Sequence, residues 1–297
     1  MTTAAVEAIP LRLRLREYYE LCKPRVVMLI TFTAIVGMFL ATPGMVPLEV
    51  LLLGSLGITL MAASAAAVNQ LLDRHVDARM ARTCGRPLVT GTLTVAESLS
   101  FAALIGAAGF GVLMTWINPL TAWLTLATLV GYAGVYTLYL KRATPQNIVI
   151  GGAAGAAPPV LGWAAVTGTI DPHALLLFLI IFVWTPPHFW ALAIDRHKEY
   201  EQAGIPMLPV THGLEFTRLQ VLLYTVLLVA VSLLPFVFGM SGFLYLAGAA
   251  VLGAVFLAYA IRLKFAPVPG LPMRTFGYSI VYLKAIFSLL LVDHYLR

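Results

Sequence analysis

Three polar residues in the stretch NQLLDRHVD share one face of a helix that is otherwise apolar. Asn69, Asp73 and Asp77 are four residues apart, and residues i and i+4 of a helix are neighbours, about 5–6 Å apart. Asp195 and Glu199 repeat this spacing in the stretch DRHKE. Carboxylates this close repel, and in a poorly solvated place one stays protonated unless a cation intervenes. Such oxygen ligands suit Mg²⁺, which typically takes one or two carboxylates plus substrate phosphates. The spacing predicts a Mg²⁺ site built from Asp73, Asp77, Asp195 and Glu199.

Basic side chains lie near these acids in the sequence. A guanidinium binds phosphate oxygens in a bidentate way, and an ammonium binds them as a point charge. Lys23 precedes the first long apolar run. The residues expected to bind an anionic substrate are Arg25, Arg82, Arg86, Lys141 and Arg142. Acids, Mg²⁺ and basic residues that open into apolar helices are typical of a site for a diphosphate with an apolar tail.

Each of these features also has an ordinary structural explanation. An Asp-x3-Asp pair at a helix end is usually a solvated terminus, and membrane topology alone demands basic residues on one side. Two acidic pairs together with Asn69 one turn earlier favour the functional interpretation.

His188, in the stretch WTPPHFWALAI, is a functional candidate because ionisable groups within membrane spans are costly. It could contact a substrate, ligate a heme iron, or be a satisfied polar group of the bundle. The sequence leaves these three roles open.

The composition predicts an all-α, polytopic membrane protein. Of the 297 residues, 60% are hydrophobic and 11% charged, whereas soluble domains carry about 25% charged residues. Several apolar runs reach the ~20 residues that span a bilayer. No room is left for a separate soluble domain, and we expect no nucleic acid partner. The nine expected spans are residues 25–41, 48–70, 95–116, 118–139, 147–167, 173–194, 217–239, 241–262 and 275–295.

The basic residues fix the orientation of these spans. Of the 19 Lys and Arg residues, 17 fall in the N-terminal segment or in the even-numbered connections. The positive-inside rule places that side in the cytoplasm, so the N-terminus is inside and the C-terminus outside. We therefore expect a cytoplasmic segment over residues 1–24 and one transmembrane domain over 25–297. Its long cytoplasmic loops are 71–92 and 195–216.

The two long loops resemble each other. The first contains DRHVD and then GRPLVTG, and the second contains DRHKE and then GIPMLPVTHG. An internal duplication would explain the likeness, since repeats in membrane proteins often place a site between their halves. A chance match of a short pattern is the other explanation.

The stretch NQLLDRHVD matches the NxxxDxxxD motif of the UbiA-type intramembrane prenyltransferases. The chain resembles in particular the branch of that family that farnesylates heme. The matching stretches extend from residue 22 to residue 210, about two thirds of the chain. They are CKPRVVMLITFTAIVGM, NQLLDRHVDARMARTCGRPL, YLKRATPQNIVIGGAAGAAPPVLGWAAVTG and WTPPHFWALAIDRHKEYEQAGIPMLPV.

The resemblance implies nine transmembrane helices around a central cavity, capped on the cytoplasmic side of a bacterial inner membrane. It implies that farnesyl diphosphate and Mg²⁺ bind at the Asp motifs and that a heme b vinyl group is farnesylated to give heme o. Heme A synthase or terminal oxidase assembly factors are the protein partners it implies.

The residues carry over unevenly from the family. Asn69, Asp73 and Asp77 fall directly on the first motif. Glu199 stands where the second motif has an acid before a tyrosine, and Asp195 has no required counterpart. Asn147 and His188 lie in matching stretches, and we take both as substrate-binding candidates.

Three alternatives stay open. The acceptor could be another aromatic or tetrapyrrole compound, because the Asp motifs do not discriminate between acceptors. A secondary transporter would suit a repeat, but it should carry charges near the midplane of the membrane. A structural subunit that merely binds heme would not need two acidic motifs.

Overall fold

The computed structural model describes residues 10–297, and every regular element in that part of the chain is helical. Eight helical segments are long and apolar enough to cross a membrane, and the pair α1–α2, bent by 53°, adds a ninth if it is taken as one span. The spanning segments are α2 (Pro24–Leu40), η1 with α3 (Val50–Gly54, Ser55–Asp77), α5 with η2 (Val95–Val112, Leu113–Ile117), α6 with η3 and α7 (Pro119–Val130, Gly131–Leu140, Lys141–Ala143), α8 with α9 (Asn147–Ala156, Pro158–Thr167), α10 (Pro172–Asp195), α13 (Gly213–Val237), α14 (Phe243–Phe265) and α15 (Leu271–Leu296).

Each of these segments overlaps one of the nine predicted spans, and the largest difference in bounds is at α3. We predicted that this span ends at residue 70, whereas the helix continues to Asp77. Asp73 and Asp77 therefore lie within the last two turns of a long helix, as their i, i+4 spacing predicts, although we had assigned residues 71–92 to a loop.

Local sequence signals explain where several spans begin. Proline occupies the first turn of α2, α6, α10 and α15, where its missing N–H leaves no hydrogen bond unmade. Thr94 and Glu97 form a capping box before α5, and Asn118 accepts a hydrogen bond from the Thr121 amide at the start of α6. Such caps satisfy amide groups that a helix terminus would otherwise leave without a partner.

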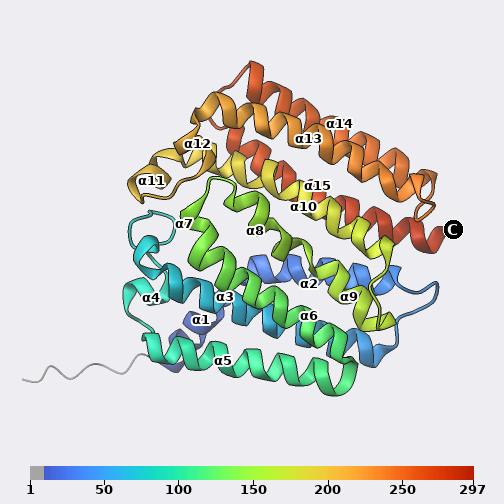
Figure 1. Cartoon of the computed structure of the whole chain (residues 1–297), viewed down its shortest axis with the longest axis horizontal. Helices are drawn as coiled ribbons and strands as arrows, with labels where there is room; N and C mark the ends of the chain where they lie inside the picture. Colours follow the sequence, from blue (N-terminus) through green and yellow to red (C-terminus); the bar gives the residue numbers. More distant parts are fainter. Residues whose placement is uncertain (1–9) are drawn as a thin grey trace, which may run out of the picture.

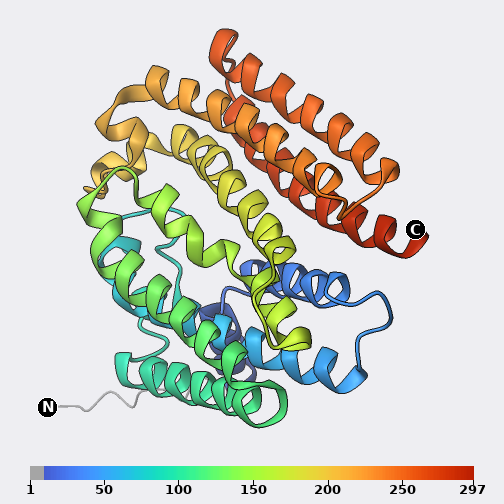
Figure 2. The same cartoon turned by 45° about the vertical axis from the view of Figure 1, so that its right-hand side comes forward.

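The spans form a ring. Contacts join α2 to α3, α3 to η3, η3 to α8, α8 to α10, α10 to α15, and α15 back to α2. Helix α5 packs on the outside of α3, while α13 and α14 pack beside α10 and α15. Figure 2 shows α13, α14 and α15 grouped at one side and the green helices at the other. Side chains on the inner faces of the ring can therefore converge from six segments.

Glycine permits one unusually close crossing in this ring. A Cβ atom on Gly37 of α2 would lie 2.2 Å from the Pro159 carbonyl oxygen, and one on Gly162 of α9 would lie 1.9 Å from the Ala34 carbonyl oxygen. No side chain fits at either position, so these glycines set how closely α2 and α9 approach. Small residues serve this role commonly between membrane helices.

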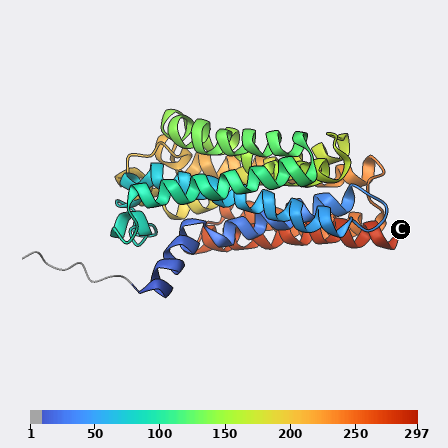
Figure 3. The ribbon, with the colours of Figure 1, turned by 90° about the horizontal axis from the view of Figure 1, so that it is seen from below.

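The long loops gather at one end of the bundle. Helices α4 (Pro87–Thr90), α11 (His197–Gln202) and α12 (Leu208–Thr211) lie there with α7, and the C-terminus lies at the other end (Figure 1). Helix α1 (Leu11–Leu21) also lies at the loop end, at an angle to the spans (Figure 3). The predicted N-terminal segment 1–24 thus contains a helix, and its residues 1–9 lie outside the described part of the chain.

Candidate functional site

The first acidic motif is buried at the end of α3. Asn69, Asp73 and Asp77 are 3%, 3% and 4% exposed, and Asn69 Nδ2 donates a hydrogen bond of 3.0 Å to Asp73 Oδ2. The three side chains thus share one face, as the spacing predicts. Buried carboxylates are costly unless they are paired or hold a metal, so their partners define the site.

Three basic residues supply those partners. Lys141 Nζ lies 2.7 Å from Asp73 Oδ2, and Arg86 forms an ion pair with Asp77 Oδ2. Lys23 donates a hydrogen bond to Asn69 Oδ1. The site therefore joins the start of α2, the end of α3, the loop after it and the start of α7.

Asn69 is the central connection of this network. Besides Lys23 and Asp73, it contacts Thr137, whose Oγ1 accepts from Asn69 Nδ2 at 2.9 Å. Thr137 lies in the π-helical segment η3 and donates to the Tyr132 carbonyl, five residues earlier. π-Helical turns are frequent at functional sites. An amide both accepts and donates, so Asn69 can link an ammonium to a carboxylate where an aspartate could not.

Lys23 has a strained backbone and an unusual environment. Among residues 10–297 it is the only non-glycine residue with a positive φ, at 51°. This left-handed conformation ends α1 and begins α2. Burial, reinforced by the nearby positive charge of Arg86, lowers the pKa of Lys23 to about 7, while Asp73 counteracts the effect. Its ammonium is therefore close to losing its proton, and an anionic ligand would favour the charged form.

The second acidic pair is less buried and is bridged by its own arginine. Asp195 is exposed at the end of α10, where Arg196 Nε lies 3.3 Å from its Oδ2. Arg196 also contacts Glu199 Oε1 at 2.7 Å. The other oxygen, Glu199 Oε2, is buried and accepts no hydrogen bond from the described residues.

The two long loops lie against each other. Met80 of the first loop belongs to one packed apolar cluster with Tyr200 and Met207 of the second. Burial raises the pKa of Tyr200, and the nearby positive charges of Arg82 and Arg86 oppose that shift. Both acidic motifs therefore occupy the same end of the bundle, on elements that pack together.

The acids fit a metal ion that takes further ligands from elsewhere. Within residues 10–297 no three His, Cys, Asp or Glu side chains lie close enough to hold a metal by themselves. Asp73 Oδ1, however, is buried without a hydrogen-bond partner among those residues, as is Glu199 Oε2. Unpaired carboxylate oxygens suit Mg²⁺, which dehydrates reluctantly and shares its coordination with water and phosphate.

The other predicted site residues divide into two groups. Arg25, Arg82 and Arg142 are exposed. Asn147 is fully buried at the start of α8, where its Nδ2 donates to the Lys141 carbonyl at 3.4 Å and its Oδ1 has no partner among the described residues. Asn147 therefore offers an acceptor beside Lys141, whereas the three exposed arginines remain outside the buried network.

Lys23 and Thr137 belong to the network but were not among the predicted site residues. A hint for Lys23 is its position next to Pro24, the first residue of α2. Thr137 gives no signal in the sequence, because the π-helical geometry of η3 decides where its side chain points.

His188 is held in an aromatic setting on α10. It is 8% exposed, and its ring stacks on Trp184, with centroids 4.2 Å apart, and on Phe276 at 4.5 Å. Its Nδ1 lies 2.6 Å from Ser279 Oγ of α15. The stacking contacts with Trp184 and Phe276 and the contact at Nδ1 thus fix the orientation of the His188 ring.

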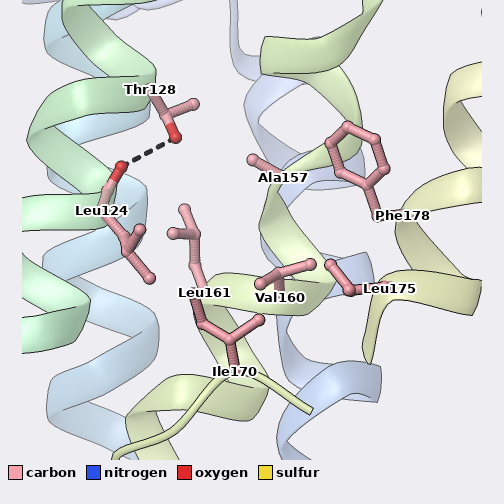
Figure 4. Close-up of a pocket in the computed structure, with 8 residues that line it drawn as sticks. All are labelled: Leu124, Thr128, Ala157, Val160, Leu161, Ile170, Leu175 and Phe178. Atoms are coloured by element: carbon pink, nitrogen blue, oxygen red, sulfur yellow. Dashed lines mark hydrogen bonds between the residues drawn. The ribbon is translucent and has the colours of Figure 1, made fainter. Parts of the chain in front are cut away.

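A separate apolar pocket of about 180 Å³ lies between α6, α9 and α10, and none of the acidic motif residues lines it (Figure 4). Its one polar side chain, Thr128, already donates to the Leu124 carbonyl at 2.9 Å. This pocket offers only apolar surface, and it holds no group that could do acid–base or phosphate chemistry. Its lining consists of Leu124, Thr128, Ala157, Val160, Leu161, Ile170, Leu175 and Phe178.

Comparison with known proteins gives concordant matches. The model of the UbiA prenyltransferase family matches residues 30–286. A protein named protoheme IX farnesyltransferase from Teredinibacter turnerae is 61% identical over 98% of this chain and 94% of its own length. Another of that name, from Alkalilimnicola ehrlichii, is 64% identical over 95% of this chain and 93% of its own length.

Solved structures share the fold. A structure from work on digeranylgeranylglyceryl phosphate synthase has a TM-score of 0.79 at 18% identity, covering 96% of this chain and 99% of that one. A UbiA homologue from Archaeoglobus fulgidus, bound to DMAPP and Mg²⁺, has a TM-score of 0.63 at 19% identity, covering 92% and 99%. At these identities the likeness concerns the fold alone.

Proposed function

The chain belongs to the UbiA prenyltransferase family. We propose a mechanism by which it transfers a farnesyl group to protoheme IX. This acceptor is heme b, and the product is heme o. The acceptor follows from relatives at 61% and 64% identity over nearly the full length of the chain, both named for that reaction. The expectation of an intramembrane prenyltransferase is thereby confirmed. The donor, the metal and the roles of individual residues are our proposals.

The donor is farnesyl diphosphate, and its diphosphate binds at the buried network around Asn69. The observation that carries this proposal is the convergence of three cationic side chains on one acidic motif. Lys23, Arg86 and Lys141 contact Asn69, Asp77 and Asp73, respectively. Clustered cations at the end of an apolar bundle match an anion with an apolar tail. Arg82 and Arg142, exposed on the same side, remain candidates for attracting the anion, as does Arg25.

Asp73, Asp77 and Glu199 are the Mg²⁺ ligands that we assign, and each would share the metal with diphosphate oxygens and water, because no three acids among the described residues converge on one ion. Asp195 would join them only if Arg196 released it. The free oxygens Asp73 Oδ1 and Glu199 Oε2 support this assignment. Mg²⁺, when bound, neutralises charge that develops on the departing diphosphate. The homologue from Archaeoglobus fulgidus was solved with Mg²⁺ and the prenyl diphosphate DMAPP, which supports a metal-dependent reaction here.

The residues of this chain then act by charge and by excluding water. When the allylic C–O bond breaks, its electron pair leaves with the diphosphate, and Lys23, Arg86 and Lys141 stabilise that charge. The apolar helices shield the farnesyl cation from water. The terminal carbon of the heme vinyl group forms the new C–C bond. The carbon next to the porphyrin then takes up water and releases a proton. No protein nucleophile is required.

The charge distribution supports a site that faces the cytoplasm. Of the 19 basic residues, 17 lie in the segments that we place on that side, and both acidic motifs lie at the loop end of the bundle (Figure 1). We place the protein in a bacterial inner membrane with its N-terminus in the cytoplasm. Heme A synthase or terminal oxidase assembly factors would receive the product.

The acceptor can be tested with two hemes that differ only in their vinyl groups. Purified protein receives farnesyl diphosphate, Mg²⁺ and either heme b or mesoheme, in which ethyl groups replace the vinyl groups. We expect heme b alone to gain the mass of one farnesyl group and one hydroxyl group. Equal reaction of both hemes, or farnesylation of a different aromatic compound in preference to heme b, would contradict the proposal.

A further inference from the structure

Ser279 of α15 controls which nitrogen of His188 carries a proton, and we propose that the other nitrogen, Nε2, ligates the iron of the heme substrate. The inference rests on the proposed function, because it takes heme as the acceptor. It adds an iron ligand and a residue that positions it.

The hydrogen bonds around Ser279 determine the tautomer. Ser279 Oγ lies 2.6 Å from the Phe276 carbonyl oxygen and 2.6 Å from His188 Nδ1. A carbonyl oxygen can only accept, so the single hydroxyl proton of Ser279 goes to Phe276. The Ser279 oxygen must then accept from His188, and Nδ1 carries the imidazole proton. Nε2 of the neutral ring is left with a free lone pair.

The surroundings also fix the plane of the ring. The Trp184 indole stacks on the His188 ring with an interplanar angle of 19°, and the Phe276 ring stacks on it with an angle of 24°. The Trp184 indole is itself held, because its Nε1 donates to the Ser279 carbonyl at 2.7 Å. Ser279 therefore contacts both His188 and the Trp184 indole that stacks on His188. His188 is 8% exposed, and its one side-chain hydrogen bond to the described residues is the contact at Nδ1.

Iron ligation suits this arrangement better than proton transfer. A histidine that acts as a general base is commonly oriented by a carboxylate, which stabilises the imidazolium that forms. Here the partner of Nδ1 is a serine oxygen, which carries no charge. A metal-bound histidine, in contrast, stays neutral and donates its other N–H to an acceptor that orients the ring and strengthens the ligand. Histidine is a usual axial ligand of heme iron.

The position of His188 on α10 relates the proposed iron site to the second acidic motif. His188 and Asp195 are seven residues apart on α10, so they share a helix face and are separated by about 10 Å along the axis. Helix α15, which carries Ser279, packs against α10 and α2 in the ring. An iron bound at His188 would therefore lie deeper in the bundle than the acidic motifs, where the apolar donor chain is expected to extend.

Spectroscopy on the purified full-length chain with ferric protoheme IX tests this assignment. Electron paramagnetic resonance of the ferric complex reports the axial ligand. Resonance Raman spectra of the reduced complex report the iron–histidine stretch, which should shift when the protein contains ¹⁵N-labelled histidine. The variants are His188→Ala, Ser279→Ala and Ser279→Thr. His173→Ala serves as the control, because His173 lies at the other end of α10 beside Asp171.

We expect an iron–histidine band in the wild type and in His173→Ala that is lost in His188→Ala and restored by added imidazole. Ser279→Ala should move the band to lower frequency and weaken heme binding about 10-fold, as for other residues that orient metal ligands. Ser279→Thr should keep the wild-type band.

Two results would overturn the inference while leaving the proposed function intact. One is a wild type that converts heme b into heme o without an isotope-sensitive iron–histidine band. The other is a Ser279→Ala protein whose band and heme affinity equal those of the wild type. If His188→Ala does not fold, the band of Ser279→Ala decides instead, because Ser279 contacts His188 at Nδ1. A wild type that binds heme through His188 but forms no farnesylated heme would instead contradict the proposed function.

Discussion

Lys141 Nζ lies 2.7 Å from Asp73 Oδ2, while the other oxygen of that carboxylate accepts no hydrogen bond from the described residues. One oxygen of the Asp73 carboxylate thus contacts the Lys141 ammonium, and the other oxygen is free to coordinate a metal ion. Asn69 donates to the same Oδ2 at 3.0 Å. This leaves Oδ1 as the oxygen of Asp73 that is available to Mg²⁺.

Replacing Lys141 by methionine should reduce heme o formation strongly. The variant removes a cation that stabilises the leaving diphosphate, and losing one such preorganised group typically costs about 10²–10³-fold in turnover. Arg142→Met is the matched control, because Arg142 is the adjacent residue and is exposed. Turnover of both variants is measured under saturating substrates. Equal losses in the two variants would show that Lys141 has no special role.

Lys23→Met should raise the KM for farnesyl diphosphate far more than Arg25→Met does. The two residues flank Pro24, yet only Lys23 reaches Asn69, whereas Arg25 is exposed. Loss of a charged contact to an anion costs about 1.5–3 kcal/mol, which is about 10- to 150-fold in binding. Steady-state kinetics of both variants check this prediction. A larger effect at Arg25 would favour the residue that the sequence alone suggested.

The same lysine should make donor capture pH-dependent. Burial lowers the pKa of Lys23 to about 7, so the free protein carries the ammonium below that pH and loses it above. We expect kcat/KM for farnesyl diphosphate to fall as the pH rises through about 7. The corresponding step should be absent from Lys23→Met, although titration of the substrate itself affects both proteins alike. Identical profiles for the two proteins would exclude Lys23 as the titrating group.

Glu199→Gln should raise the Mg²⁺ concentration that gives half-maximal activity. The carboxylate has one buried oxygen without a partner, and removing groups of a metal site commonly costs about 10–100-fold in affinity. Glu201→Gln changes an exposed acid two residues away and should leave the Mg²⁺ dependence unchanged. A Glu199→Gln protein with the wild-type Mg²⁺ dependence would remove Glu199 from the proposed metal site.

Gly162→Ala should destabilise the bundle, whereas Gly155→Ala should not. A Cβ at Gly162 would lie 1.9 Å from a backbone oxygen of α2, but a Cβ at Gly155 would meet nothing within 4 Å. Overpacking typically costs about 1–3 kcal/mol, and more where backbone must move. Thermal unfolding in detergent compares the two variants. Equal melting temperatures would show that α2 and α9 can separate without cost.

The apolar runs were sufficient to predict the order of the spans, and their number agrees with the structure if the bent pair α1–α2 is taken as one span. Each run is close to the length that a bilayer requires, and this constraint leaves little freedom in placing helices. The i, i+4 spacing likewise placed Asn69, Asp73 and Asp77 on one face, and they are buried together.

Contacts between distant segments could not be predicted in this way. The choice between Lys23 and Arg25 depends on a left-handed backbone conformation at Lys23, which no periodicity reveals. The inclusion of Thr137 depends on the π-helical geometry of η3. The tautomer of His188 depends on Ser279, which is 91 residues away in the sequence.

The role of the Asp73 carboxylate is tested most directly by heme o formation in Asp73→Asn. This variant is measured beside wild type and Glu201→Gln in reconstituted membranes with heme b, farnesyl diphosphate and Mg²⁺. Extracted hemes are identified by mass, and heme binding is measured on the same samples. We expect wild type and Glu201→Gln to form heme that carries a farnesyl group and a hydroxyl group. Asp73→Asn should bind heme normally but lose about 10²–10³-fold in product formation. Wild-type rates in Asp73→Asn would contradict the claim that this buried carboxylate activates the diphosphate.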